Sequence, residues 1–582
     1  MDDRVSELAA ELGVTSSFVL KKLAELGERG LTESSPLRTS TARQMREWVR
    51  NQDKSLDDLP DRTSRQSSWR AGAVRPPIHP DTIKNVNTLK RRFNIANEHQ
   101  ESLNSLGSQF LFANYCKVAG SEDCMVGLVR FSGAIESAFG MTREVMFFYS
   151  PYPDLQNRTF KAARRTIANL DREVTPDIIF LWSPDPRLRE KLDDWSSHSF
   201  LAIPLDIESG APPISFVSLI RDYIFTRDLF YETTPVQGDN FFGRRQLLQS
   251  LRDDVKNQRV AGLFGLRKAG KTSVLSELSH SISGPENIVL LRDLESLPSP
   301  PKDPVPQLVQ ELVGDLSAQL ETRSIDFKEL GKLIDKPDLA QFKSALQAVM
   351  RKLNQSGIAV VVLLDEIEYL TPSDRIDIHE GPMTTISQFL GVLRSLVQEN
   401  ENFTFLLSGL TSAIVEDGRL YGRPNPLFSW AKAHYLAPFE RYEADDLALS
   451  LGRKMGIEIQ ESALSALFEA SGGHAFLYRH LASLVVSKLP VDVFSRIIVR
   501  RDVLHVQTDW HRLIAGNMRE MLDHVRRYYP DEAFLLDVLR DEPEEFESLS
   551  VMSQSALGHL LSLGLIIRDG NGYELTPVLQ LT

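Results

Sequence analysis

Eight consecutive residues, from Gly265 to Thr272, have the types and spacing of a phosphate-binding loop. They read G-L-R-K-A-G-K-T. The glycines let bare backbone N–H groups close around an anion, the lysine neutralises β- and γ-phosphates, and the threonine hydroxyl holds Mg²⁺. The pattern predicts ATP and Mg²⁺ as cofactors. The expected nucleotide contacts are Gly265, Leu266, Arg267, Lys268, Ala269, Gly270, Lys271, Thr272 and Ser273. Arg267 and Lys268 either contact phosphate or face solvent.

An acidic pair, Asp365-Glu366, is the second chemical signal. It directly follows the apolar, β-branched run 358–364. At the end of a buried parallel strand, Asp365 would orient the magnesium shell as a metal ligand beside Thr272. Glu366 would polarise the attacking water, as a hydrolysing ATPase requires. The alternative is that the pair caps the next helix.

The elements around these motifs fit a doubly wound sheet. Residues 260–264 are short, apolar and strand-like, and a helix is expected to begin at Thr272. Strand, glycine loop and helix are the context in which a phosphate loop works. The strand expected at 358–364 has the continuous apolar character of a central parallel strand covered on both faces.

Composition indicates a multidomain, soluble, cytoplasmic protein. A chain of 582 residues is expected to form roughly three to five domains. No apolar run approaches the ~20 residues of a membrane span, and the N-terminus lacks a secretory signal. The two cysteines, Cys116 and Cys124, suit a reducing compartment. A net charge of −13 does not favour nucleic acid as a partner.

Residues 81–230 are predicted to form a small, parallel α/β domain that begins with helices. Strands are expected at 144–149, 177–182 and 200–205, with helices at 158–168 and 187–195 between them. Asp154, Asp185 and Asp206 follow the strands and could converge at their carboxyl ends. The plainer interpretation is a regulatory or docking domain with solvated turn carboxylates.

Several segments in a fixed order carry a family resemblance. They are NFFGRR at 240–245, GLFGLRKAGKTSVL, VVVLLDEIEYL, FTFLLSGLTSAI, RPNPLF, LAPFE and SGGHAFLYRHLASLV. Over roughly 238–490 the chain resembles the AAA-related STAND class of ATPases and the archaeal ATPases near it. The resemblance implies that Gly243 and Arg244 lie by the adenine, that Ser408 is a γ-phosphate sensor, and that Arg423 reaches a γ-phosphate.

The same resemblance leaves open the roles of two residues. Arg423 is either that catalytic arginine, acting in cis or across an interface, or a surface arginine in a proline-rich loop. His474, at the start of an expected lid helix, either approaches the nucleotide or is a structural histidine.

The two ends of the chain add accessory modules. The run RVSELAAELGVTSSFVLKKLAELGERG resembles the N-terminal helical module of bacterial translation initiation factor two. That resemblance implies a nucleic-acid or ribosome contact through residues 1–50, but eight basic and eight acidic residues cancel there. Near the C-terminus, Asp569-Gly570-Asn571-Gly572 is a hairpin signal that predicts a winged helix. Its charge favours intramolecular docking over DNA binding.

The expected fold is a multidomain α/β protein with a central P-loop parallel sheet. The predicted parts are a helical module (1–50), a flexible linker (51–80), an α/β regulatory domain (81–230), a P-loop ATPase core (236–440), a helical lid (441–520) and a winged helix (521–582).

The predicted function is a slow bacterial ATPase that acts as a regulatory switch, engaging a protein partner or self-associating, without a membrane. The alternatives are a nucleic-acid-associated ATPase of the origin-recognition or loader type, a translation-linked factor, and a stress or antiviral effector.

Overall fold

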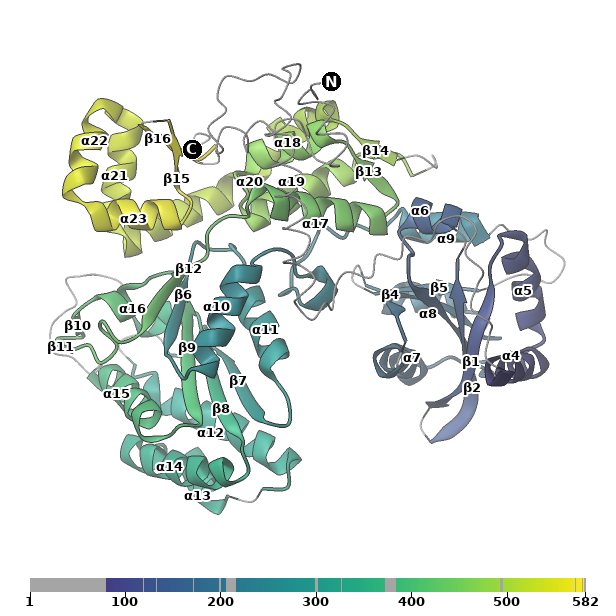
Figure 1. Ribbon diagram of the computed structural model, residues 1–582, viewed down its shortest axis with the longest axis horizontal. Coiled ribbons are helices and arrows are strands. Elements are labelled where there is room, and N and C mark those ends of the chain that lie inside the picture. Colours follow the sequence, from purple (N-terminus) through teal and green to yellow (C-terminus); the bar gives the residue numbers. More distant parts are fainter. Residues whose placement is uncertain are drawn as a thin grey trace, which may run out of the picture. The chain divides into compact units, whose positions relative to one another are not determined.

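The computed structural model describes residues 80–582, apart from 119, 132, 171, 198–199, 206–215, 299–301, 326, 372–383, 492–495, 571, 578 and 580–582. The predicted module at 1–50, nearly all of the linker at 51–80, and Asp206 lie outside the described residues. The chain divides into two units, 1–77 and 78–582, and the description concerns the second (Figure 1).

A five-stranded parallel sheet forms the centre of the region predicted to be the ATPase core. Its strands are β6 (Ala261–Phe264), β7 (Asn287–Asp293), β8 (Ala359–Asp365), β9 (Phe403–Gly409) and β12 (Lys432–Tyr435). The spatial order is β12-β6-β9-β8-β7. Strand β6, which precedes the phosphate loop, and strand β8, which ends in Asp365, therefore lie on either side of β9.

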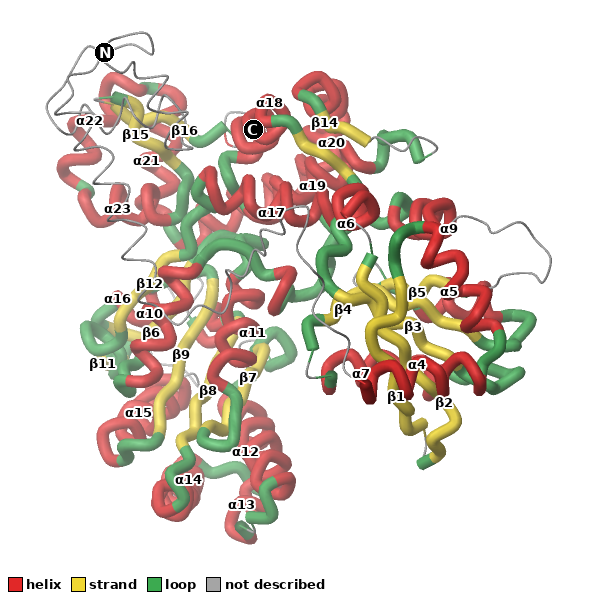
Figure 2. The backbone as a smooth tube through the Cα atoms, turned by 45° about the vertical axis from the view of Figure 1, so that its right-hand side comes forward, coloured by secondary structure: helices red, strands yellow, loops and turns green. Residues whose placement is uncertain are grey.

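Both faces of this sheet are buried, as the apolar strand sequences require. Along β8, Val361 and Leu363 join one hydrophobic cluster, whereas Val360, Val362 and Leu364 join another. The helices of this region lie on the two sides of the sheet (Figure 2). They are α10 (Arg245–Lys256), α11 (Lys271–Ile282), α12 (Val305–Thr322), α13 (Lys328–Asp335), α14 (Leu339–Gln355) and α15 (Thr384–Glu399).

The preceding domain contains a mixed sheet, not the parallel one predicted. Its order is β1-β2-β3-β4-β5, in which β1, β2 and β3 are antiparallel and β3, β4 and β5 are parallel. The strands are β1 (Gln109–Val118), β2 (Ser121–Arg130), β3 (Glu144–Tyr149), β4 (Val174–Trp182) and β5 (Leu201–Pro204). Sequence reasoning missed β1 and β2. Along β1, bulges interrupt the alternation of buried and exposed residues.

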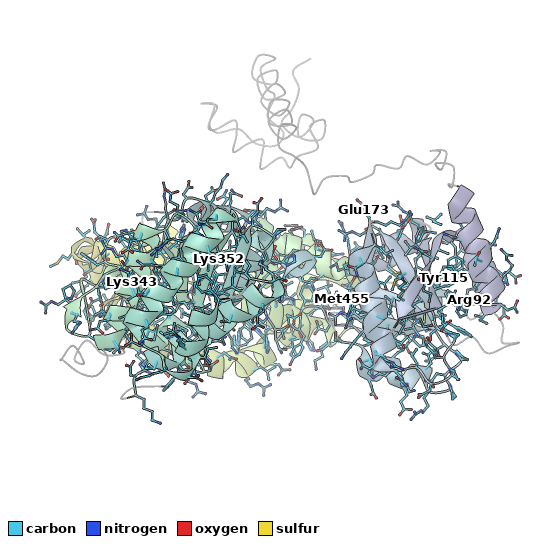
Figure 3. The ribbon with its side chains drawn as sticks, turned by 90° about the horizontal axis from the view of Figure 1, so that it is seen from below. Arg92, Tyr115, Glu173, Lys343, Lys352 and Met455 are labelled. Atoms are coloured by element: carbon cyan, nitrogen blue, oxygen red, sulfur yellow. The ribbon has the colours of Figure 1, made fainter. Side chains whose placement is uncertain are left out.

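Helices pack on this mixed sheet, and one of them contacts its edge strand. They are α4 (Pro80–Arg92), α5 (Ile95–Ser105), α6 (Gly133–Phe139), α7 (Asn157–Asn169), α8 (Leu188–Trp195) and α9 (Phe216–Ile224). The guanidinium of Arg92, which ends α4, lies 5.7 Å from the ring centre of Tyr115 on the edge strand β1 (Figure 3). The helices predicted at 158–168 and 187–195 are present as α7 and α8.

Helices dominate the rest of the chain. The predicted lid contains α17 (Arg441–Lys454), α18 (Glu461–Ser471), α19 (Ala475–Val486), the short strands β13 (Ile457–Ile459) and β14 (Arg496–Ile498), and α20 (Arg500–Tyr528). Three helices and a hairpin follow: α21 (Pro530–Asp541), α22 (Pro543–Met552), α23 (Gln554–Ser562), β15 (Ile566–Asp569) and β16 (Gly572–Leu575). The hairpin lies where the sequence predicts it.

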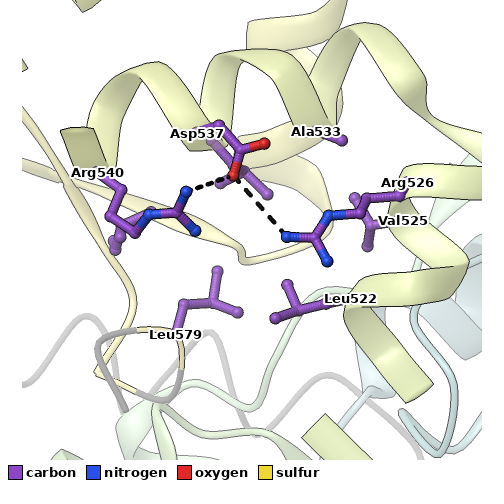
Figure 4. Close-up of a pocket in the computed structure, with 9 residues that line it drawn as sticks. Leu522, Val525, Arg526, Ala533, Asp537, Arg540 and Leu579 are labelled. Atoms are coloured by element: carbon purple, nitrogen blue, oxygen red, sulfur yellow. Dashed lines mark ion pairs between the residues drawn. The ribbon is translucent and has the colours of Figure 1, made fainter. Parts of the chain in front are cut away.

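One predicted boundary needs correction. Helix α20 runs without a break through residue 521, where the winged helix was expected to begin, and ends at Tyr528. Pro530, which cannot continue the hydrogen bonding of α20, begins α21. Across this joint, Asp537 of α21 forms ion pairs with Arg526 of α20 (4.0 Å) and with Arg540 (2.9 Å), beside a cavity of about 30 Å³ (Figure 4).

Candidate functional site: the phosphate loop and the edge of the parallel sheet

The predicted phosphate loop connects β6 to α11. Gly270, at the N-cap of α11, has φ 102°, and a Cβ placed there would meet no atom within 4 Å. The Nζ of Lys271 is buried and lies 3.2 Å from the carbonyl oxygen of Gly265 and 3.1 Å from that of Leu266. The ammonium is thus held inside the loop by backbone oxygens, which a phosphate would replace as its partner.

Asp365 lies at the carboxyl end of β8 and faces the phosphate loop. It is buried, and burial raises its pKa, whereas the nearby hydroxyls of Thr272 and Ser408 and the charge of Lys271 lower it. In turn, the pKa of Lys271 is lowered by burial, while Glu368, Glu366 and Asp365 oppose that shift. The loop and the acidic strand end therefore meet in space, as the sequence prediction requires.

Glu366 has a left-handed backbone conformation, with φ 58° and ψ 47°. This conformation is unfavourable for a residue with a side chain and is typical of functional sites. Burial raises the pKa of Glu366, and so does the neighbouring carboxyl of Glu368, while Lys271 lowers it. Its side chain does not cap the 3-10 turn that follows (Ile367–Leu370), so the capping alternative is not realised.

Glu368 is a neighbour that sequence reasoning missed. Its Oε2 accepts a hydrogen bond from the N–H of Leu410, at 3.1 Å, and would lie 2.5 Å from a Cβ added at Gly409. The carboxylate therefore crosses the end of β9 beside Glu366. The signal available in the sequence was a second acidic residue two positions after Glu366.

Ser408 is on β9, between the phosphate-loop strand and the acidic strand. It pairs in register with Leu263 of β6, and its side chain is fully buried. Its Oγ faces the buried carboxylate of Asp365 and lowers the pKa of that group. The hydroxyl therefore lies at the place where a cation and a phosphate are expected.

Gly243 and Arg244 connect the core to the predicted lid. The backbone N–H of Arg244 donates to Oε1 of Glu443 in α17, at 2.6 Å, and its guanidinium donates to the carbonyl of Ala437. A Cβ at Gly243 would lie 2.8 Å from Cδ of Glu443. Burial lowers the pKa of Arg244 to about 10. The pair thus packs against the core–lid junction, and the adenine contact stays a prediction.

The two basic side chains inside the loop are directed toward helices that follow the core. Arg267 forms an ion pair with Glu520 of α20, at 3.3 Å. The Nζ of Lys268 lies 4.4 Å from the ring centre of Phe476 in α19. Sequence reasoning missed Glu520 and Phe476, which are distant in the chain. The sequence predicted that Arg267 and Lys268 either contact phosphate or face solvent, and neither alternative included these intramolecular contacts.

Arg423 is not brought to the phosphate loop by any contact in the described part of the chain. It lies exposed on β11 (Arg423–Pro424), which pairs with β10 (Arg419–Leu420). Asn425 anchors this hairpin by donating to the carbonyls of Ile414 and Asp417, at 2.9 and 2.8 Å. A contact from Arg423 to a nucleotide stays a prediction.

In the mixed-sheet domain, Asp154 and Asp185 do converge, around Lys191. The Nζ of Lys191 lies 2.5 Å from Asp154 and 2.7 Å from Asp185. Asp185 also accepts hydrogen bonds from the N–H groups of Leu155 and Arg187, at 2.7 and 2.8 Å. Asp185 is buried, so it is not the solvated turn carboxylate that was expected, and its oxygens are used in holding two loops together.

The residues at the sheet edge fit a magnesium-bound nucleotide. The Ser408 hydroxyl faces Asp365, and the loop places Lys271 at the N-terminus of α11. Within the described residues no group of three or more His, Cys, Asp or Glu side chains could hold a metal by itself. Thr272 and Asp365 would be the protein's ligands to Mg²⁺, and the phosphates would supply others.

The fold and the site define a P-loop nucleotide-binding protein: a parallel sheet with a phosphate loop on one strand and an acidic pair on another. No protein-family model and no curated protein matches the chain. No helix within the described residues combines the length and apolarity needed to cross a membrane.

Three solved structures that align with this chain illustrate the likeness. The Walker-type ATPase of Pyrococcus abyssi is 17% identical, with TM-score 0.44, covering 60% of this chain and 98% of that one. The Aeropyrum pernix ORC2 protein is 12% identical (TM-score 0.36; 61% and 95%), and the Thermotoga maritima RuvB branch-migration motor is 16% identical (0.29; 60% and 96%). These likenesses are distant, so the class rests on the sheet order and the loop.

Proposed function

We propose that the chain is an ATP-binding, ATP-hydrolysing regulatory switch of the AAA-related STAND class. The observation that supports this most is the meeting of Lys271, Asp365 and Glu366 at one edge of the parallel sheet. Lys271 would hold the phosphates, Thr272 and Asp365 would hold Mg²⁺, and Glu366 would orient water. The bound metal would neutralise charge that develops on the phosphates.

The switch part of the proposal is supported by contacts between the site and the later helices. Arg267 and Lys268 leave the phosphate loop and contact Glu520 and Phe476. Beyond α20, Tyr529 accepts a hydrogen bond from the N–H of Ser412, just after β9, at 3.1 Å. A ligand that changes the loop would therefore change contacts to the lid and to the C-terminal helices, which is the coupling that a switch requires.

ATP hydrolysis by the full chain tests the enzymatic part. Lys271→Ala should lose ATP binding, whereas Glu366→Gln should bind ATP and lose about 100-fold or more of its turnover, as expected when a catalytic base is removed. Lys256→Ala, at an exposed lysine that ends α10, is the matched control. Normal binding and hydrolysis by Lys271→Ala would show that the site assignment is wrong. Affinity isolation of Glu366→Gln with ATP tests for a protein partner.

One observation favours the second candidate, a nucleic-acid-associated ATPase. Helix α7 has no acidic residue, and Arg158, Lys161 and Arg165 are exposed along one side of it without ion pairs in the described part of the chain. Such a stripe suits a phosphodiester backbone. Nucleic-acid-stimulated turnover that falls steeply with salt would favour this function, and its absence at low salt would count against it.

A further inference from the structure

A cavity of about 250 Å³ lies where three parts of the chain meet, and no residue of the phosphate loop lines it. Its walls come from the mixed-sheet domain, from the segment before the ATPase core and from helix α17 of the lid. One water molecule needs only ~10–15 Å³ of such space, so the cavity has room for a small organic molecule. Sites for small molecules occur preferentially between domains.

The parts of the chain around the cavity pack closely against each other. A Cβ added at Gly140 would lie 2.4 Å from the carbonyl oxygen of Arg453, which is in α17. A Cβ added at Gly456 would lie 3.0 Å from the carbonyl oxygen of Ala138, which is in α6. Because backbone meets backbone here without intervening side chains, the cavity is a local gap beside close packing, not the result of a loose contact.

One part of the wall is apolar. Phe139, Met141 and Ile178 of the mixed-sheet domain are buried there, and Phe242 of the segment before the core is half-buried. These side chains would lose contact with water if an apolar group filled the cavity, which favours a ligand with an aromatic or aliphatic body.

Both carboxylates that line the cavity already have cationic partners. Asp177 forms an ion pair with Arg227, at 2.8 Å, and Asp239 forms one with Arg143, also at 2.8 Å. Their negative charges are therefore compensated within the chain, and the cavity has no carboxylate left over for a cationic ligand.

Lys454 is the lining cation that lacks such compensation. It lies in the last turn of α17 and is half-buried. Its Nζ lies 3.4 Å from Oδ1 of Asn240, a neutral oxygen, and it forms no ion pair with the described residues. A half-buried ammonium beside a cavity suits a carboxylate or phosphate group, which it would bind as a point charge.

The cavity adjoins the junction between core and lid. Phe242 directly precedes Gly243 and Arg244, and the N–H of Arg244 donates to Oε1 of Glu443 in α17, at 2.6 Å. Lys454 belongs to the same helix. An occupant would therefore contact both partners of the junction, the segment that leads into the core and the helix that begins the lid.

We propose that this cavity binds a small organic anion, with its carboxylate or phosphate on Lys454 and its apolar body against Phe242, and that occupancy changes ATP turnover. The binding site goes beyond the proposed function, and the effect on turnover rests on it. A ligand that favours one arrangement of the junction shifts the equilibrium between arrangements, which is how it would reach the nucleotide.

The binding test is a titration of the full-length chain with phenyl phosphate and benzoate, followed by ligand-observed NMR, with benzyl alcohol as the neutral counterpart. Lys454→Gln should weaken binding of both anions about 10-fold, the value of a hydrogen bond between charged groups, and leave benzyl alcohol unaffected. Lys488→Gln, at an exposed lysine after α19, is the matched control and should bind as the unmodified chain does.

Two further variants locate the bound anions. Ser450→Phe adds a ring to a lining residue of α17 and should abolish binding of all three compounds, with a melting temperature close to that of the unmodified chain. Lys271→Ala should leave phenyl phosphate binding unchanged. Loss of binding in Lys271→Ala would place the compound in the phosphate loop and overturn the inference, as would equal binding by the unmodified and Lys454→Gln chains, or no binding of either anion.

ATP hydrolysis with and without benzoate tests the regulatory part. Benzoate should change the turnover of the unmodified chain and have about 10-fold less effect, at the same concentration, on Lys454→Gln. Turnover that ignores benzoate, in a chain that binds it through Lys454, would overturn the coupling. Binding through Lys454 by a chain that does not bind ATP would support the cavity and contradict the proposed function.

Discussion

The imidazole of His559 lies 3.2 Å from the carboxylate of Glu416, joining α23 to the short helix α16 (Ala413–Glu416) that follows β9. Its other ring nitrogen lies 2.6 Å from Glu532 of α21. The two carboxylates raise the pKa of His559 to about 9, from an ordinary value of 6.5. This charged contact holds the C-terminal helices against the nucleotide-binding core.

The His559 contact predicts a pH-dependent stability. Because the folded-state pKa lies above the unfolded value, the stabilisation is complete below about pH 6.5 and is lost as the pH rises to about 9. The difference in melting temperature between the unmodified chain and His559→Gln should be largest near pH 6 and shrink steadily toward pH 9.5. A difference that stays constant over this range would contradict the charged contact.

The conformation of Gly243 at the core–lid junction predicts that two glycine-to-alanine substitutions change stability in opposite directions. Gly243→Ala should destabilise the fold by about 1–3 kcal/mol, because φ is +65° and the new Cβ would meet Glu443. Gly314→Ala, in the interior of α12 with no atom near its added Cβ, should stabilise it by up to about 1 kcal/mol. Urea titration measures both, and equal effects of the two substitutions would contradict the junction's packing.

The parts of the site that could be predicted are contiguous in sequence. Lys271 and Thr272 follow a glycine loop, and Asp365 ends a run of seven apolar residues, so local rules place both motifs. The contact from Arg267 to Glu520 spans more than 250 positions and depends on how α20 packs. The left-handed conformation of Glu366 is likewise imposed by surrounding structure and has no local signal.

The missed edge strand of the mixed sheet, β1, has a similar explanation. Along β1 the buried positions include Phe110, Ala113, Cys116 and Val118, so strict alternation fails at the register shifts. Parallel strands such as β3 and β4, buried on both faces, appear as continuous apolar runs and are easily predicted. In an edge strand such as β1, the pattern of buried residues depends on the pairing with its neighbour, so this strand is harder to predict.

Substitutions of Asp154 and Asp185 should show whether the cluster around Lys191 has a structural or a catalytic role. Asp185→Asn removes the charge from a buried carboxylate that holds Lys191 and two backbone N–H groups, so it should cost about 2–4 kcal/mol of stability. Asp154→Asn, at a 70% exposed side chain, should change stability by less than about 0.5 kcal/mol. Chemical denaturation compares them. Loss of a biological activity in folded Asp154→Asn would contradict a purely structural cluster.

Ser408 should affect turnover more than stability. Its buried Oγ faces the carboxylate of Asp365 and lowers the pKa of that group, so Ser408→Ala should lower the nucleotide-free stability by no more than about 1 kcal/mol. If the same hydroxyl contacts the phosphates or the metal shell during hydrolysis, turnover should fall about 10-fold, equivalent to about 1.4 kcal/mol in the transition state.

Thr404→Ala, on the same strand but bonded to the carbonyl of Arg259, is the control and should lower stability. Thermal melting and steady-state ATP hydrolysis give the two readouts. A Ser408→Ala chain that is less stable and fully active would show that the hydroxyl serves packing and not the site.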